Sequence, residues 1–192
     1  MSTLRIIAGT AKGMRIHAVP GDSTRPITDR AKEALFNIIS TDVIESTWLD
    51  CFGGTGSVSI EALSRGARMT TIIDLHPLAI ETIKRNLSQT KFNRKAEVIK
   101  SDSLTYLKKT PNNSFEYVFI APPQYKGLWE ETLRVIDSNP NWVSEDGWII
   151  VQIHPVEYKP IVLNNFIEFD KRKYGSTLFV FFQKPLKNNL TM

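Results

Sequence analysis

Short apolar runs alternate along most of this chain with longer segments in which apolar residues recur every three or four positions. The short runs are rich in β-branched and aromatic residues and end at turn residues, which is typical of strands. The longer segments have the spacing of amphipathic helices. Regular alternation of strand and helix predicts a doubly wound, mostly parallel sheet. Strands are expected at 47–50, 69–74, 96–99, 115–120 and 148–153, and helices after 57, after 77, around 104–107 and over 128–136.

The first forty residues depart from this alternation. Segments 4–7 and 14–18 are extended in character and flank the turn residues 9–13, which predicts a small β-hairpin. A helix follows from position 29, and the hydroxyl of Thr28 is placed to cap its first turn. We therefore expect a hairpin and a helix to form an N-terminal extension over 1–40.

The alternation of strand and helix also stops near the end of the chain. Segments 167–174 and 178–182 are rich in strand-forming residues, and Gly175-Ser176-Thr177 joins them. This spacing predicts an antiparallel hairpin that closes the sheet. Together with the five strands above it gives seven, so the expected fold class is α/β: a Rossmann-like, doubly wound, mostly parallel seven-stranded sheet.

Size and composition are those of an ordinary globular protein. The 192 residues are 42% hydrophobic and 23% charged, which suits a single domain over 1–192. No apolar run reaches the ~18 residues of a membrane span. The start lacks a signal-peptide core, and one cysteine suits a reducing compartment. We expect a cytoplasmic monomer, and the net charge of +4 is compatible with a polyanionic partner without requiring one.

The richest stretch for chemistry is 48–57, where an apolar strand ends at Asp50 and three glycines follow before a helix begins. Glycines at such a corner allow positive φ and let a ligand approach the backbone, and helix-terminal amides face that ligand. A phosphate loop would need Lys and Ser or Thr after its last glycine, and Ser59 breaks the dinucleotide fingerprint. The spacing Asp50-x-Phe52-x-Gly54-x-Gly56 resembles the first motif of S-adenosylmethionine-dependent methyltransferases. Taken alone, it also fits a glycine-rich corner without a ligand.

Acidic residues recur where the predicted strands end. Asp50, Asp74 and Asp102 each follow a strand, and Ala121-Pro122-Pro123 follows the next one. Ligands of open parallel sheets bind beyond these carboxyl ends. Asp74 is spaced to accept hydrogen bonds from a ribose diol, and Asp102 is placed for the adenine edge. Helix capping is the other interpretation of Asp74 and Asp102, and for Asp102 the two interpretations fit the sequence equally well.

A wider resemblance covers nearly the whole chain in order. It includes Arg25–Arg30 before a helix with Leu35-Phe36-Asn37, the glycine corner, Glu61–Ala67, Lys84–Leu87, Ser101–Leu104 and Lys173–Thr177. With these motifs the chain resembles the bacterial methyltransferases that modify the 2-amino group of a guanine in small-subunit (16S) ribosomal RNA. The resemblance implies S-adenosylmethionine as the cofactor, S-adenosylhomocysteine as the product, and ribosomal RNA in an assembling small subunit as the partner. The implied cofactor-binding residues are Asp50, Phe52, Gly53, Gly54, Gly56, Asp74, Leu75, Asp102 and Ser103.

The chain departs from that family at the expected reaction centre. The family usually has Asp-Pro-Pro-Phe or Asp-Pro-Pro-Tyr, where this chain has Ala121-Pro122-Pro123-Gln124 with Tyr125 one place later. The implied catalytic residues are therefore Ala121, Pro122, Pro123 and Tyr125: backbone carbonyls hold the amine, prolines fix the backbone, and the ring stacks on the base. Gln124, Gln152 and His154 are candidates for the missing acceptor, although His154 also fits a surface residue before Pro155.

Other reactive side chains suggest no further chemistry. Cys51 lies inside the cofactor turn and is interpreted as a packing residue. The three histidines share no metal-ligand spacing, and methyl transfer to an amine needs no metal, so no metal site is expected.

Basic residues at the front of the chain are expected to contact RNA around the substrate entrance, if the hairpin folds over strand 115–120. Guanidinium groups match phosphates in geometry, although solvated surface charge is an equally ordinary explanation for Lys12 and Lys126. A guanine in a loop, or one splayed from its stack, is the expected target. The proposed RNA-binding residues are Lys12, Arg15, Arg25, Thr28, Arg30 and Lys126.

Three other functions are compatible with parts of the sequence. Similar Pro-Pro motifs serve methylation of the 6-amino group of adenine in nucleic acids. The loss of the acid at position 121 also fits a catalytically weakened relative that binds RNA as an assembly factor. A nicotinamide oxidoreductase could use the same sheet, but Ser59 and the lack of a candidate hydride-transfer acid argue against it.

Overall fold

A computed structural model describes residues 4–21 and 27–185 of the chain. One seven-stranded sheet with the strand order β3-β2-β1-β4-β5-β7-β6 forms the middle layer. The strands are β1 (Thr47–Asp50), β2 (Met69–Asp74), β3 (Ala96–Lys100), β4 (Phe115–Ile120), β5 (Val143–Ile153), β6 (Ile167–Tyr174) and β7 (Thr177–Gln183). All neighbours pair in parallel except β7, which is antiparallel to both β5 and β6. The predicted fold class and the closing hairpin are confirmed.

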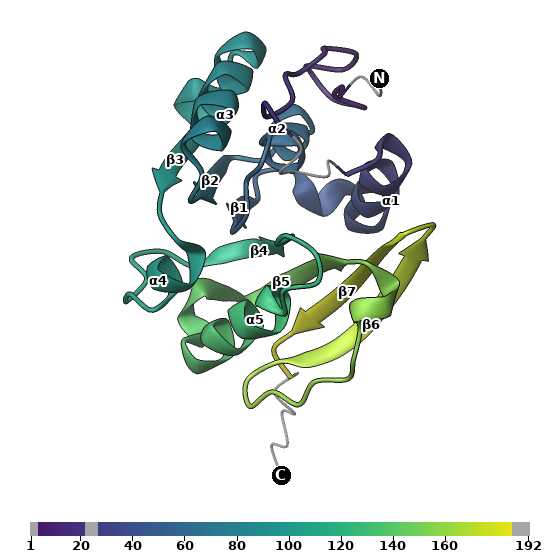
Figure 1. The fold of residues 1–192 in the computed structure, drawn as a ribbon, viewed down its shortest axis with the longest axis vertical. Coiled ribbons are helices and arrows are strands. Elements are labelled where there is room, and N and C mark those ends of the chain that lie inside the picture. Colours follow the sequence, from purple (N-terminus) through teal and green to yellow (C-terminus); the bar gives the residue numbers. More distant parts are fainter. Residues whose placement is uncertain (1–3, 22–26, 186–192) are drawn as a thin grey trace.

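Helices cover both faces of the sheet (Figure 1). One face carries α1 (Asp29–Ile39), α2 (Ser57–Ser64) and α3 (Pro77–Thr90), and the other carries α4 (Ser103–Leu107) and α5 (Leu128–Ser138). Short 3₁₀ helices occupy Ser40–Val43, Asn93–Lys95, Pro140–Trp142 and Pro155–Glu157. Each face has its own hydrophobic core: the first lies under α1, α2 and α3, and the second under α4 and α5. Successive strand residues point to opposite faces, so Phe119 packs in the first core and Ile120 in the second. Burial on both faces explains why the central strands are continuous apolar runs.

Strand β5 is longer than the sequence predicts. It begins at Val143, which pairs with Phe115, and the register then shifts before Tyr117 pairs with Trp148. Asp146-Gly147 resembles a turn in the sequence but lies inside this irregular strand. A Cβ at Gly147 would lie 2.8 Å from the carbonyl oxygen of Phe115. The glycine therefore permits close approach of the two strands, as glycines in strands often do.

The N-terminal extension packs on helices rather than adding to the sheet. The expected hairpin is present in short form: the Ile6 amide donates to the Met14 carbonyl and the Ile16 amide to the Leu4 carbonyl, both at 2.9 Å, around an antiparallel bridge between Arg5 and Arg15. The segment lies against α2, where the Thr10 amide donates to the Ser64 carbonyl at 2.8 Å. It is also held by α3, where the Asn86 side chain bonds both the amide and the carbonyl of His17, at 2.8 and 3.0 Å. Figure 1 shows this segment, in purple, beside α2 and α3.

A buried ionic cluster joins this extension to the first core. Lys32 of α1 and Glu61 of α2 are 1% and 0% exposed, and their charged atoms lie 3.5 Å apart. Glu61 also accepts the amides of Ile7 and Ala8 and an ion pair from Arg65 at 2.8 Å. Burial lowers the pKa of Lys32, and the charge of Glu61 opposes that shift. The cluster ties three separate segments together because each charge is hydrogen-bonded as well as paired.

Candidate functional site

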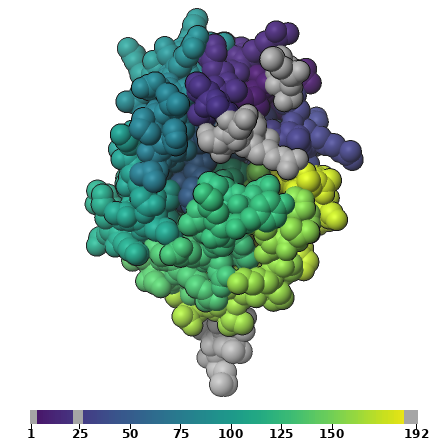
Figure 2. All heavy atoms as spheres, in the orientation of Figure 1, coloured from purple at the N-terminus to yellow at the C-terminus, as the bar shows by residue number. Residues whose placement is uncertain are grey.

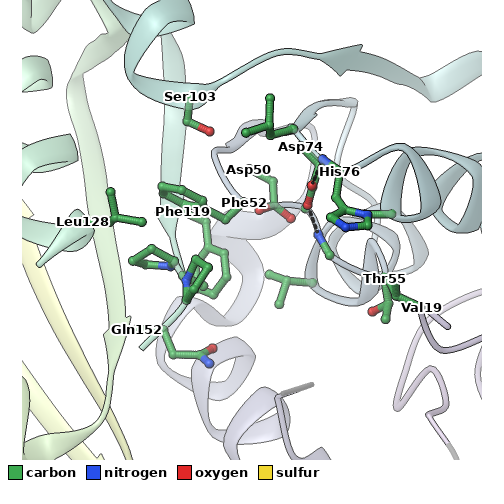
Figure 3. Close-up of a pocket in the computed structure, with 18 of the residues that line it drawn as sticks. Val19, Asp50, Phe52, Thr55, Asp74, His76, Ser103, Phe119, Leu128 and Gln152 are labelled. Atoms are coloured by element: carbon green, nitrogen blue, oxygen red, sulfur yellow. Dashed lines mark hydrogen bonds between the residues drawn. The ribbon is translucent and has the colours of Figure 1, made fainter. Parts of the chain in front are cut away.

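A cavity of about 710 Å³ lies beyond the carboxyl ends of β1, β2, β4 and β5. The surface is hollowed where its blue and green parts meet (Figure 2), and Figure 3 shows the side chains that line the cavity. Val19, close to the end of the described segment 4–21, and Ile27, at the start of 27–185, add to its wall. Most of the predicted site residues lie together here: Asp50, Phe52, Gly53, Gly54, Asp74, Leu75, Asp102, Ser103, Ala121, Pro122, Pro123 and Lys126.

The glycine corner forms one wall of the cavity. The amide of Gly53 donates to the Ile73 carbonyl at 2.8 Å, and a Cβ at Gly53 would lie 2.4 Å from the side chain of Ile72. Gly54 has a φ of +54°, and no atom lies within 4 Å of where its Cβ would stand. Gly56, with a φ of +75°, caps α2 and does not line the cavity. Gly53 thus serves packing, while Gly54 leaves the backbone open to a ligand.

Asp74 fixes the shape of this corner. Its Oδ2 accepts the Gly54 amide at 2.8 Å, and its Oδ1 accepts the His76 amide at the same distance (Figure 3). Asp74 does not cap α3, because the N-cap of this helix is His76 and the Asp74 side chain accepts the amide of that residue, not an amide of the first helical turn. A carboxylate offers about four acceptor positions. The two oxygens of Asp74 therefore keep capacity for the hydroxyls of a ligand.

Asp50 is the buried acid of the site. It is 2% exposed, and the Ser59 hydroxyl donates to its Oδ2 at 2.8 Å. Its other oxygen, Oδ1, is buried and has no hydrogen-bond partner among the described residues. Burial raises the pKa of Asp50 to about 7, and the nearby charge of Asp74 adds to the shift. A buried, unpaired acceptor facing a cavity is a position for a ligand donor or cation. Sequence reasoning used Ser59 only to exclude a dinucleotide site and missed this role.

Asp102 and Ser103 complete the far side. The Asp102 Oδ1 accepts the amide and the hydroxyl of Thr105, at 2.8 and 2.9 Å, so it caps α4 as one of the two interpretations expected. The Ser103 hydroxyl donates to the carbonyl of Cys51. Cys51 itself is fully buried, and burial raises the pKa of its thiol well above the usual range. Its interpretation as a packing residue is confirmed.

The segment after β4 enters the cavity at Ala121, Pro122 and Pro123. Tyr125 does not line it: this residue has a φ of +62°, its amide donates to Glu157 at 2.7 Å, and its ring lies 5.9 Å from that of His154. The side chain of Tyr125 is 66% exposed. A stacking role for Tyr125 stays a prediction.

The three candidate acceptors differ in their surroundings. Gln124 and Gln152 both line the cavity. His154 does not, because it caps the short helix Pro155–Glu157, where its Nδ1 accepts the Val156 amide at 3.3 Å.

The predicted RNA-binding residues are only partly gathered. Lys126 lines the cavity, whereas the exposed Lys12, Arg15 and Arg30 do not. Thr28 caps α1 by accepting the Ala31 amide at 3.2 Å, as the sequence predicts. Arg25 lies outside the described residues. The segment that carries Lys12 and Arg15 packs on α2 and α3, and RNA contact by these two residues stays a prediction.

No group of three or more His, Cys, Asp or Glu residues in 4–21 and 27–185 is arranged to hold a metal ion. Within the same ranges, every helix is too short or too polar to cross a bilayer.

Comparisons with known proteins agree with this geometry. The family model described as "Conserved hypothetical protein 95" matches residues 4–183. Ribosomal RNA small subunit methyltransferase D of Escherichia coli K12 is 31% identical over 183 residues, covering 94% of this chain and 90% of that protein. Its Haemophilus influenzae counterpart is 35% identical, covering 83% and 82%. The solved structure named "Putative methyltransferase yhhF from Escherichia coli" is 29% identical with a TM-score of 0.85, covering 97% of this chain and all of that one.

These matches extend over nearly the whole described chain, from the N-terminal extension to β7. They confirm the class I methyltransferase fold predicted from the sequence, and S-adenosylmethionine as the cofactor that the resemblance implied. The open glycine corner and the unpaired Asp50 oxygen are compatible with such a ligand. The chain belongs to the family described as "Conserved hypothetical protein 95", with the bacterial small-subunit ribosomal RNA methyltransferases D as its relatives.

Proposed function

We propose that this protein transfers a methyl group from S-adenosylmethionine to the 2-amino group of a guanine in small-subunit ribosomal RNA. The observation that carries the proposal is one cavity that joins the glycine corner and its acids to the Ala121-Pro122-Pro123 segment. The names of its relatives support ribosomal RNA as the substrate class. The choice of the guanine 2-amino group comes from the sequence resemblance.

In this proposal the two sides of the cavity have different roles. Asp74 and Asp102 accept hydrogen bonds from the hydroxyl and amine groups of the cofactor, while the open backbone at Gly54 allows its close approach. The ionised form of Asp50 is stabilised by the positive charge that the cofactor brings. Bound S-adenosylmethionine supplies a methyl group on a sulfonium: the C–S bond breaks with its electron pair passing to sulfur, the N–C bond forms, and the amine nitrogen releases one proton to water.

The other side holds the nucleophile. An exocyclic amine is a poor nucleophile because its lone pair is delocalised into the ring. The carbonyls of Ala121 and Pro122 accept its N–H groups and orient the lone pair. Neither Pro122 nor Pro123 has a backbone N–H that would compete for these acceptors. Tyr125 supplies a stacking ring if the segment rearranges around the base, because its exposed side chain does not line the cavity.

RNA is held by basic residues outside the reaction centre. We propose Lys126 at the cavity wall, with Arg30, Lys12, Arg15, Arg25 and Thr28 as further contacts. The protein acts as a cytoplasmic monomer, with the extension 1–40 serving RNA contact and the target exposed in an assembling small subunit. Sedimentation of the protein with and without small-subunit particles tests the monomer and the assembly context.

The activity is tested with methyl-labelled S-adenosylmethionine and unmodified small-subunit RNA, both free and in particles. We expect label in RNA and, after digestion to nucleosides, in 2-methylguanosine. Label in 6-methyladenosine would overturn the guanine assignment while retaining methyl transfer. RNA binding without any transfer would instead establish an assembly factor. Calorimetry with S-adenosylhomocysteine and a nicotinamide cofactor separates all of these from an oxidoreductase.

A further inference from the structure

An unpaired acceptor lies in the cavity wall near the end of β4. In the described residues, three buried side-chain atoms have no hydrogen-bond partner: Asp50 Oδ1, Thr70 Oγ1 and Gln152 Oε1. Asp50 and Gln152 line the same cavity, whereas Thr70 lies away from it on β2. The amide of Gln152 projects from β5 toward the cavity, near Phe119 (Figure 3). One orphaned acceptor thus stands on the cofactor side of the cavity and one near the reaction centre.

The strand register explains where Gln152 stands. Ile120 pairs with Val151 in the parallel ladder of β4 and β5, so Ala121 and Gln152 come next to each other at the strand ends. Neighbouring residues of parallel strands point to the same face. Ala121 packs on the first core, as do Phe119 and Ile150, and this is also the face of Gln152. Ala121, Pro122 and Gln152 accordingly line the same cavity, and the side chain of Ala121 ends at its Cβ.

A buried amide oxygen without a partner is unfavourable, because it loses its hydrogen bonds to water and gains none in return. An apolar residue at position 152 would avoid this penalty. The oxygen faces a cavity, so a ligand donor can satisfy it. The other nearby candidates lack this property: Gln124 has no buried unpaired atom, and His154 caps a short helix.

Resting on the proposed function, we propose that Gln152 is a substrate-positioning residue. Its Oε1 accepts one N–H of the target base's exocyclic amine, next to the carbonyls of Ala121 and Pro122. The amide is not a base and takes no proton. It orients the amine lone pair and favours the partial positive charge that develops on nitrogen as the new bond forms.

The test compares Gln152→Leu with Gln152→Glu and with Thr70→Val, which removes a buried unpaired oxygen outside the cavity. We expect Gln152→Leu to lower kcat for RNA methylation 10- to 100-fold, with S-adenosylhomocysteine affinity within twofold of wild type. We expect Gln152→Glu, which keeps an acceptor, to retain at least tenfold more activity than Gln152→Leu. Thr70→Val is expected to keep wild-type kcat, and neither apolar variant is expected to lower the melting temperature.

A double variant tests whether an acceptor supplied from the neighbouring position 121 can replace the one lost at position 152. Because Ala121 and Gln152 are neighbours on one face, Ala121→Asp in the Gln152→Leu background is expected to restore kcat at least fivefold. Wild-type kcat in Gln152→Leu would overturn the proposal for Gln152 and leave the proposed function intact. A folded Gln152→Leu that loses cofactor affinity in parallel with kcat would also overturn it. Absence of methyl transfer by the wild-type protein would overturn the proposed function and this inference with it.

Discussion

At the scale of single residues, Asp50 places the energetic cost of burying an acid at the wall of the proposed ligand site. The acid is 2% exposed at the cavity wall, its Oδ2 accepts the Ser59 hydroxyl, and its Oδ1 has no hydrogen-bond partner in 4–21 and 27–185. Burial penalises the carboxylate, which is why the pKa rises to about 7. A cationic ligand favours the ionised form, so binding and loss of this proton are coupled. A stability penalty is therefore concentrated at the proposed ligand site.

The raised pKa of Asp50 predicts that stability without ligand falls between about pH 4 and pH 7. In that range the folded protein holds a proton that the unfolded chain, with an ordinary carboxyl, has released. The free energy of unfolding therefore decreases as the pH rises, and the loss is complete above the folded pKa of about 7. A shift of about three pKa units corresponds to at most about 4 kcal/mol.

Urea unfolding of the wild type and Asp50→Asn at pH 5 and pH 8 measures this effect. Asn cannot ionise, so the variant lacks the Asp50 contribution and retains those of all other groups. We expect the wild type to lose more stability than the variant over this interval. Equal losses in the two proteins would show that Asp50 ionises normally.

At the scale of elements, the attachment of the N-terminal extension to α2 depends on Gly9. A Cβ at Gly9 would lie 1.8 Å from the Ser64 carbonyl oxygen, whereas one at Gly13 would meet nothing within 4 Å. Both glycines have nearly the same φ, +82° and +81°. Gly13→Ala is therefore a matched control: both variants incur the strain of positive φ, and only Gly9→Ala also clashes with backbone.

We expect Gly13→Ala to cost about 1–2 kcal/mol and Gly9→Ala to cost about 1–3 kcal/mol more, measured by chemical denaturation. Because the extension carries Val19 to the cavity wall, Gly9→Ala is also expected to weaken S-adenosylhomocysteine binding more than Gly13→Ala. Equal effects on stability and binding would show that the extension can shift away from α2 without loss.

The elements also show what the sequence can and cannot predict. Strand–helix alternation and the acids at strand ends predicted the sheet and most of the cavity lining, because both depend on local periodicity. The pairing of Lys32 with Glu61 could not be predicted, since each looks like an ordinary helical surface charge until the extension covers it. The docking of the extension on α2 and α3 depends on contacts between residues more than fifty positions apart. The orphaned oxygen of Gln152 likewise needed the β4–β5 register.

At the scale of the whole molecule, the cavity lies at the carboxyl ends of the parallel strands, and the positive charge is distributed more widely. Lys126 stands in the cavity wall. Lys95 is exposed and directly precedes β3. It therefore lies at the amino ends of the parallel strands, on the opposite side of the sheet from the cavity. RNA bound over the cavity would meet the first and not the second. Charge placement, rather than the net charge of +4, therefore distinguishes specific RNA contact from general attraction.

Salt dependence of RNA binding tests this distinction. A lysine that contacts a phosphate of single-stranded RNA contributes about 0.7 to the slope of log affinity against log salt concentration. We expect Lys126→Ala to reduce the slope by about this amount and Lys95→Ala, which removes the same charge, to leave the slope unchanged. The measurement is a binding titration at several salt concentrations with one RNA. Equal slope changes in the two variants would mean that RNA affinity depends only on the overall charge of the protein. The proposed contact between RNA and Lys126 at the cavity wall would then be wrong.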